Sequence, residues 1–500
     1  FPFFFVQIIS SLFDQIFITR KEMREVLTIE VGQAGIQMGN AIWEQYCAEH
    51  GIDRTGQRKE ANKNRDTSFK VFFEETESGQ FVPRNIAVDL EPSVIDDVKN
   101  GPFASIFHPE YLLNGKEDAA NNFARGHYSV GKPMLDRVMD KMRKLVERSD
   151  NVMGFQMAHS VGGGTGSGLG ASILERLTVD YRKIPKLGFE VYPSPNLSTC
   201  VVEPYNALLA THSLLENTDV SFVLDNEALY GICQKQLRIQ KPDFDNLNRL
   251  IAKVISSVTA SIRFSGELSV DVADFLTNLV PFPRLHFMTT GMSPIIPKMN
   301  VSMIPVDVHK ITDDCFKPQN WFVKFTEFDP DEDRYMAISL SYRGNIQPRD
   351  SSNAIQWLKD NNKIRLVEWC PTGFKVGLND VPAATLESDD IAAFDKNAVM
   401  IANNTAISRV FTKRIAQKFD LMYSQRAFVH WFVGEGMEEG EFAEAREDLD
   451  CLSQEYLDTC SSCYSHFFFF FYKQNIVVVC AVMFVLTKCF DFFFELEIRS

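Results

Sequence analysis

Apolar and polar positions alternate along this chain in blocks that predict strands followed by helices. Residues 152–158 are apolar and free of charge, as is typical of a buried strand. Residues 169–183 follow with a helical spacing, in which one face carries Leu169, Ile173, Leu174 and Leu177. The pattern therefore predicts a strand, a turn and a helix, in that order.

The same alternation extends through most of the chain. Short apolar runs predict further strands at residues 24–29, 85–89, 186–191 and 220–224. Apolar residues spaced three or four apart predict helices that begin at Pro133 and at Asp245, the second ending at Ile262. Two more helices are predicted at residues 411–423 and 435–456. Strands that alternate with helices indicate an α/β fold with a parallel sheet.

The turn between the first predicted strand and helix is the glycine-rich run GGGTGSG, residues 162–168. Glycine has no Cβ, so a ligand can approach the backbone, and the helix start offers unpaired N–H groups and a positive dipole end to a phosphate. Thr165 and Ser167 add hydroxyl donors. A flexible linker is the alternative, but linkers do not join a buried strand to an amphipathic helix. The run lacks the Walker and dinucleotide spacings, so it predicts a nucleotide-phosphate site of another kind.

Length, charge and cysteine content limit the number of domains, the class of binding partner and the kind of metal site that can be expected. The length of 500 residues predicts two or three domains. The 51 basic and 66 acidic residues give a net charge of −15, which argues against nucleic acid and favours basic partners or divalent cations. Ten cysteines are scattered, and the one CxxC motif, Cys460 and Cys463, has no second pair. Reduced thiols without a zinc site are therefore expected.

The run GGGTGSG after a buried strand is the signature loop of the tubulins, and the chain resembles that family from about Met23 to Tyr456. Within the family it is most similar to the α class, as in the stretches at residues 117–122 and 368–375. The resemblance implies a Rossmann-like GTP-binding domain over residues 23–225 and a mixed α/β intermediate domain over 226–403. It also implies a central helix at 245–262 that joins the two, and a helical hairpin over 404–457.

The two ends lie outside the resemblance. Residues 1–22 are apolar and precede Met23, and we expect them to be a non-native extension. Residues 458–500 form an atypical apolar tail whose longest apolar run is too short to span a bilayer well. We expect translated non-coding sequence in this tail. A membrane anchor is the weaker alternative for both ends.

The residues themselves predict part of a ligand site. Asp89 and Glu91 follow a strand at the sheet edge where ligands bind in open α/β folds, and they can hold Mg²⁺ through water. A solvated turn before Pro92 is an equal alternative from the residues alone. The resemblance to tubulins implies a GTP and Mg²⁺ site, with Asp89 and Glu91 at the metal. Its implied GTP-binding residues are Gln33, Asp89, Glu91, Asp118, Ala120, Asn121, Ser160, Gly163, Gly164, Thr165, Gly166, Ser198, Thr199, Glu203, Asn226, Phe244 and Asn248.

Two positions depart from the α-class pattern. Phe244 replaces the usual tyrosine, so stacking on the guanine is kept and one hydroxyl is lost, which predicts weaker binding. Asp274 replaces the glutamate that positions water on the next subunit's GTP. It is the expected catalytic residue, supplied in trans. Its side chain is one methylene shorter, and the loss of reach predicts slow hydrolysis.

The resemblance also implies the partners. We expect a GTPase subunit of cytoplasmic microtubules that pairs with β-tubulin and holds its own GTP without exchange. Motors and microtubule-associated proteins are expected on an acidic helix face made by Glu438, Glu439, Glu441, Glu444, Glu447 and Asp448. A solvated helix is the alternative there. The loop at residues 288–303 matches the family's lateral-contact loop but lacks its usual aromatic residue. The alternative function is therefore a non-polymerising tubulin relative or the product of a decayed gene.

Overall fold

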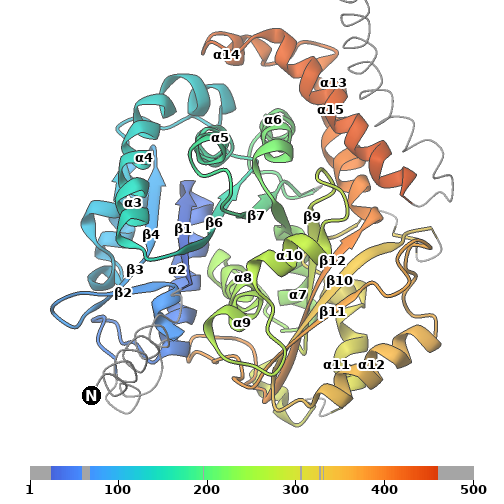
Figure 1. The fold of residues 1–500 in the computed structure, drawn as a ribbon. Coiled ribbons are helices and arrows are strands. Elements are labelled where there is room, and N and C mark those ends of the chain that lie inside the picture. The colour runs from blue at the N-terminus through green and yellow to red at the C-terminus, as the bar shows by residue number, and fades with distance from the viewer. Residues whose placement is uncertain are drawn as a thin grey trace, which may run out of the picture.

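One ten-stranded sheet runs through the whole protein (Figure 1). The computed structural model describes residues 24–58, 68–194, 196–303, 307–325, 328–329 and 332–459. The strand order in the sheet is β11-β10-β12-β9-β8-β7-β6-β1-β4-β5. The expectations for residues 1–22 and for the tail from residue 460 onward lie outside the described residues.

Six neighbouring strands of this sheet are parallel and form the first half of the molecule. They are β1 (Glu25–Val31), β4 (Asn85–Asp89), β5 (Leu112–Asn114), β6 (Val152–Ser160), β7 (Lys186–Tyr192) and β8 (Val220–Asp225). Strand β1 shows why they are apolar throughout: Val26 packs on one face of the sheet, while Leu27 and Ile29 pack on the other. Each predicted strand is confirmed, with bounds that differ by two residues at most.

The sheet changes direction at β9 (Phe287–Ser293), which is parallel to β8 and antiparallel to its other neighbour. That neighbour is β12 (Lys396–Asn404), followed by β10 (Tyr335–Gly344) and the edge strand β11 (Phe374–Asn379). A separate antiparallel pair is made by β2 (Phe73–Glu75) and β3 (Phe81–Pro83). The fold is therefore α/β, with a parallel half and a mixed half on one continuous sheet.

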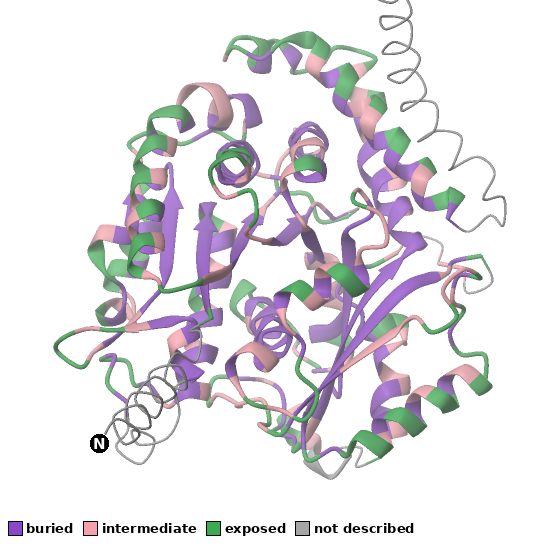
Figure 2. Ribbon diagram, viewed as in Figure 1, coloured by how far each residue is buried: buried purple, intermediate pink, exposed green. Residues whose placement is uncertain are grey.

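Helices cover the sheet in three groups, each with its own hydrophobic core. The first group is α2 (Gly32–His50), α3 (Pro92–Asn100), α7 (Asn226–Lys235), α8 (Phe244–Val258), α9 (Ala260–Arg263) and α10 (Val272–Leu279). On the opposite face lie α4 (Gly131–Arg148), α5 (Gly170–Asp180), α6 (Glu203–Asn217), the π-helical segment η10 (Val410–Ala416), α13 (Gln417–Tyr423), α14 (Val429–Val433) and α15 (Glu439–Asp458). The third group, α11 (Val308–Cys315) and α12 (Pro348–Asp360), covers β10 and β12. Figure 2 shows the strands buried between these layers.

The bounds of two predicted helices differ for a local reason. The central helix ends at Val258 and resumes as α9, because Thr259 between them has φ −89° and ψ −2°, away from the regular helical values. The last helix begins at Glu439 and not at residue 435, since Gly436 has a φ of +100°, which does not fit a right-handed helix. Within the described residues, no helix combines the length and the apolar character needed to cross a membrane.

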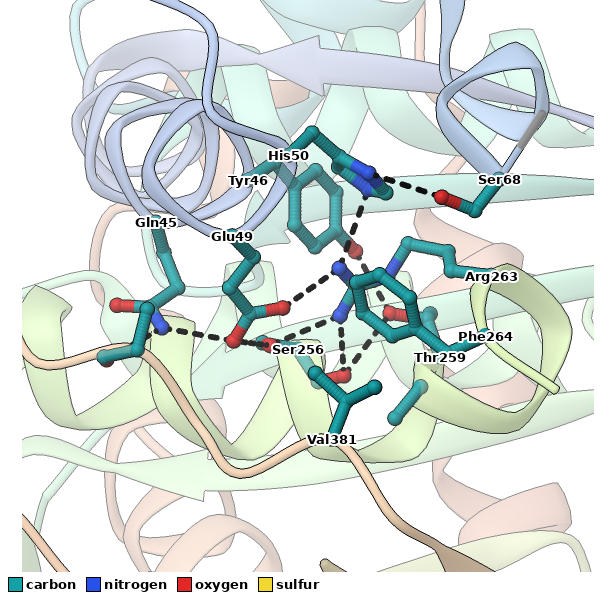
Figure 3. Close-up of polar contacts among 12 residues, drawn as sticks. Gln45, Tyr46, Glu49, His50, Ser68, Ser256, Thr259, Arg263, Phe264 and Val381 are labelled. Carbon is teal, nitrogen blue, oxygen red and sulfur yellow. Dashed lines mark hydrogen bonds and ion pairs between the residues drawn. The ribbon is translucent and has the colours of Figure 1, made fainter. Parts of the chain in front are cut away.

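A buried ionic network joins the two halves of the sheet, and Figure 3 shows the part of it around Glu49 and Arg263. Glu49, near the end of α2, accepts hydrogen bonds from Arg263 of α9 and from Arg343 of β10, at 2.6 and 3.1 Å. The Ser256 hydroxyl of α8 donates to the same carboxylate at 2.7 Å. Since α2 begins at the ligand edge of the parallel strands, this network ties that half to the mixed half.

Candidate nucleotide site

A cavity of about 320 Å³ lies at the carboxyl ends of the parallel strands. The loops that follow β1, β4, β6, β7 and β8 all contribute to its lining. Open α/β sheets bind ligands at this edge, because successive strand–helix turns converge there. The cavity therefore lies where the glycine loop and the acidic pair were expected.

The glycines of the loop serve two different purposes. A Cβ on Gly164 would fall 2.7 Å from the Asn122 nitrogen, and one on Gly166 would fall 2.5 Å from the Ser160 carbonyl oxygen. A Cβ on Gly163 would meet no described atom within 4 Å. Gly164 and Gly166 thus let neighbouring backbone segments pack closely. Gly163 keeps open space on the cavity side for a ligand.

One expected donor in this loop is not available. The Ser167 hydroxyl bonds back to the carbonyl oxygens of Gly163 and Gly164, the second at 3.4 Å. Ser167 does not line the cavity, whereas Thr165 does. The first turn of the helix, Thr165–Leu169, is π-helical, and α5 continues from it. The prediction that Ser167 is a ligand donor is therefore wrong.

Three carboxyl groups line the cavity beside the glycine loop: Asp89, Glu91 and Asp118. Asp89 is 4% exposed and accepts the Glu91 backbone N–H at 3.4 Å. Burial raises the pKa of Asp89 to about 6, and the nearby charges of Asp118 and Glu91 add to this rise. A divalent cation would relieve the repulsion between these carboxylates.

Asp118 also shapes the turn that follows it. Its carboxylate accepts the backbone N–H groups of Ala119 and Ala120 at 2.7 and 3.2 Å. These bonds hold a tight turn in which Ala120 and Asn121 have φ angles of 47° and 55°. Asn121 lines the cavity as a result, while Ala120 does not.

Glu203, the first residue of α6, organises another wall of the cavity. Its Oε1 accepts the backbone N–H and the hydroxyl of Thr199, both at 2.9 Å. Its Oε2 accepts the Ser198 hydroxyl at 3.1 Å. Thr199 and Glu203 line the cavity, whereas Ser198 is exposed outside the lining. Ser198, Thr199 and Glu203, three of the predicted GTP-binding residues, are thus joined in one hydrogen-bonded group.

The residues expected at the base divide between the cavity and its surroundings. Asn226 lines the cavity at the start of α7. Phe244 is 51% exposed and Asn248 is 8% exposed, and both lie on α8 outside the lining. Tyr230 contacts Phe244 edge to face, with ring centroids 6.4 Å apart. The other predicted binding residues that line the cavity are Gln33, Ser160, Gly163, Gly164, Thr165 and Gly166.

Sequence reasoning missed several residues of the lining. They include Tyr192, the last residue of β7, and Pro193, Ser194, Leu197 and Cys200, which come after it. The prolines at 193 and 195 mark a loop after a predicted strand. The rule that ligands bind at the carboxyl edge of a parallel sheet would have identified this loop.

The expected catalytic residue lies away from this cavity. Asp274 is in the first turn of α10, where its carboxylate accepts the Asp271 backbone N–H at 3.1 Å in a capping box. Lys375 of β11 lies 3.3 Å from the same carboxylate. The Asp274 side chain is 35% exposed, so it can face a neighbouring molecule.

The sheet, the open glycine loop and the carboxylates at its ligand edge define an α/β nucleotide-binding protein. Comparison with known families shows which one. Residues 25–234 match the Tubulin/FtsZ family GTPase domain, and residues 283–416 match the tubulin C-terminal domain. This chain belongs to the tubulin family.

Two curated relatives show the class within the family. The nucleomorph tubulin alpha chain of Guillardia theta is 54% identical over 436 residues, which cover 87% of this chain and 96% of the relative. The tubulin alpha-2 chain of Schizosaccharomyces pombe is 52% identical, with the same coverage of each chain. The chain is therefore an α-tubulin-like subunit with a GTPase domain of the tubulin type.

Proposed function

We propose that the cavity binds GTP with Mg²⁺, and that the chain pairs with β-tubulin in cytoplasmic microtubules. The observation that carries the proposal is one cavity lined by the glycine loop, three carboxylates and the Thr199–Glu203 group. Phosphate would lie at the open Gly163 and the N-terminus of the π-helical turn, where backbone N–H groups and the helix dipole favour an anion.

The donor set fits a magnesium ion bound together with phosphate. Among the described residues, no group of three or more His, Cys, Asp or Glu side chains could hold a metal by itself. Mg²⁺ commonly takes one or two carboxylates and completes its octahedral shell with water and phosphate oxygens. Asp89 and Glu91 would supply the protein part, and the ion would offset the phosphate charge when bound.

Other residues of the cavity lining would contact the base and the ribose. The Asn226 amide can both donate to and accept from a purine edge. Thr199 and Glu203 would face the ribose, and the exposed ring of Phe244 would stack on the base. A GTP held at the pairing surface of an α–β dimer would not exchange.

We also propose that Asp274 acts on the GTP of the next subunit. Its partly exposed carboxylate lies outside the chain's own cavity, which suits a residue supplied in trans. The Asp271 N–H and Lys375 hold the carboxylate in place, so it can orient an attacking water. The short side chain predicts slow hydrolysis.

The surface of α15 supports binding of motors and associated proteins, but with fewer acids than expected. Glu441 accepts the Tyr128 hydroxyl at 2.6 Å, and Asp448 contacts His212 at 2.9 Å and Arg284. These two expected surface acids are therefore partly used inside the protein. The other four expected acids, Glu438, Glu439, Glu444 and Glu447, are exposed.

The test is the nucleotide content of the full chain co-expressed with a β-tubulin. The heterodimer is purified, exchanged against excess GDP, denatured, and its released nucleotide identified. One GTP per dimer that survives exchange is expected. A heterodimer without guanine nucleotide, or no heterodimer, would contradict the proposal.

A further inference from the structure

A buried ion pair joins the C-terminal segment to the ligand edge of the sheet. Asp225 is the last residue of β8, and its side chain is 0% exposed. Arg414 lies in η10 with its side chain 3% exposed, and its Nη1 donates to Asp225 Oδ2 at 2.7 Å. Neither residue lines the nucleotide cavity.

The other oxygen of Asp225 holds two elements that do line the cavity. Oδ1 accepts the Ser194 hydroxyl at 2.7 Å and the Glu227 backbone N–H at 2.9 Å. The second bond is the N-cap of α7, whose first residue is Asn226. The orientation of this one carboxylate therefore sets the positions of Ser194 and Asn226.

Only one nitrogen of the Arg414 side chain, Nη1, takes part in this arrangement. Its Nε and Nη2 atoms are buried and have no hydrogen-bond partner among the described residues. A buried guanidinium with unpaired nitrogens is costly, and a buried ion pair of this kind is weak evidence for a stabilising role. Its one directed contact is the carboxylate that orients Asn226.

We propose that Arg414 is a positioning residue for the nucleotide base, acting through Asp225 on Asn226 and Ser194. The inference rests on the proposed function, because it takes Asn226 to face the bound guanine. It adds a link between the outer helical layer and the nucleotide. A shift of η10 that moved Arg414 would loosen the cap of α7 and speed nucleotide release.

The experiment measures how fast the heterodimer of the full chain with β-tubulin loses its exchange-resistant GTP after Mg²⁺ is chelated. Arg414→Met and Asp225→Asn should each speed release about tenfold, which corresponds to about 1.4 kcal/mol. Asp225→Asn keeps an oxygen acceptor for the cap and loses only the charge that pairs with Arg414. The release rate of Arg414→Lys should lie between those of wild type and Arg414→Met, because lysine keeps the charge but lacks the planar guanidinium that fixes the direction of its hydrogen bonds.

The matched control is Arg409→Met. Arg409 pairs with Asp333 at 2.8 Å in the same part of the chain, and neither residue lines the cavity. This variant should lose an ion pair yet release GTP at the wild-type rate. Comparison with this control separates an effect on nucleotide release from a general loss of stability. Thermal unfolding of each variant measures that loss of stability.

A double-mutant cycle tests the route through Asn226. Arg414→Met should add little to the faster release of Asn226→Ala. Wild-type release from folded Arg414→Met and Asp225→Asn, or fully additive effects with Asn226→Ala, would overturn the inference. A wild-type dimer without GTP, or Asn226→Ala with unchanged release, would instead contradict the proposed site, and the inference would fall with it.

Discussion

Glu49 and Arg263 form an ion pair of 2.6 Å although 214 residues separate them, and both side chains are almost completely buried (Figure 3). Arg343 shares the same carboxylate at 3.1 Å, so one negative charge holds two positive ones. Burial alone would raise the pKa of Glu49, but the two guanidinium groups outweigh it and hold that pKa well below its usual range. The pair joins α2, which starts at the cavity, to both halves of the sheet.

Replacing Glu49 by glutamine should destabilise the protein strongly. The change would leave two buried guanidinium groups without a counter-charge, a loss of about 3–5 kcal/mol in other buried pairs. Thermal unfolding of the heterodimer checks the result. Glu44→Gln on the same helix, where the side chain is half-buried, is the control and should change stability little. Equal unfolding temperatures for both variants would show that the network contributes nothing.

Magnesium affinity should fall as the pH drops through about 6. The pKa of Asp89 is raised to about 6, so the protonated, neutral form prevails below that pH and cannot act as a metal ligand. Retention of GTP and Mg²⁺ in the dimer, measured from pH 7.5 to about 5, reports the effect. Asp89→Asn should bind Mg²⁺ weakly at every pH and lose this dependence. A pH profile shared by wild type and Asp89→Asn would assign the titration to another group.

Lengthening the proposed catalytic carboxylate should speed GTP hydrolysis. Asp274→Glu restores one methylene, and positional errors of about 1 Å can cost about 100-fold in rate. Phosphate release from assembled polymer should therefore rise by about 10- to 100-fold in this variant, while Asp274→Asn should abolish it. Glu267→Gln in the preceding loop is the control. No change with Asp274→Glu would mean that reach does not limit the rate.

Restoring a hydroxyl at position 244 should slow nucleotide release. Phe244 is half-exposed on α8 beside Tyr230, so a tyrosine has room for its hydroxyl. One added hydrogen bond is worth about 0.5–1.5 kcal/mol, or about 2- to 10-fold in the release rate. The measurement is GTP loss from the chelated dimer. Identical release from both forms would indicate that residue 244 does not meet the base.

Much of the fold and of the candidate site could be predicted from the sequence because its signals are local. A charge-free run such as residues 152–158 favours burial, and all of it except Val152 and Met153 is buried. Glycines between a strand and a helix leave backbone open to a ligand. Asp89 and Glu91 follow a strand, so the edge rule placed them at the cavity. The α-class resemblance supplied further lining residues: Gln33, Asp118, Asn121, Ser160, Thr199, Glu203 and Asn226.

Helix bounds and the use of individual polar groups were harder to predict. The central helix is interrupted at Thr259, whose hydroxyl contacts the Tyr46 hydroxyl at 3.0 Å, and Ser167 bonds to its own loop instead of facing the cavity. Glu441 and Asp448 have the spacing of surface residues but contact Tyr128, His212 and Arg284. Each outcome depends on a partner that no local pattern specifies.

The sequence by itself determined the alternation of strands and helices in the parallel half, the phosphate-facing loop and the family, since these depend on periodicity and on residue types a few positions apart. Only the tertiary structure decided which distant charges meet. Arg414 and Asp225 are 189 residues apart, and their contact exists because η10 packs over the end of β8. Buried ion pairs need a specific geometry to offset desolvation, and that geometry comes from the packing of whole layers.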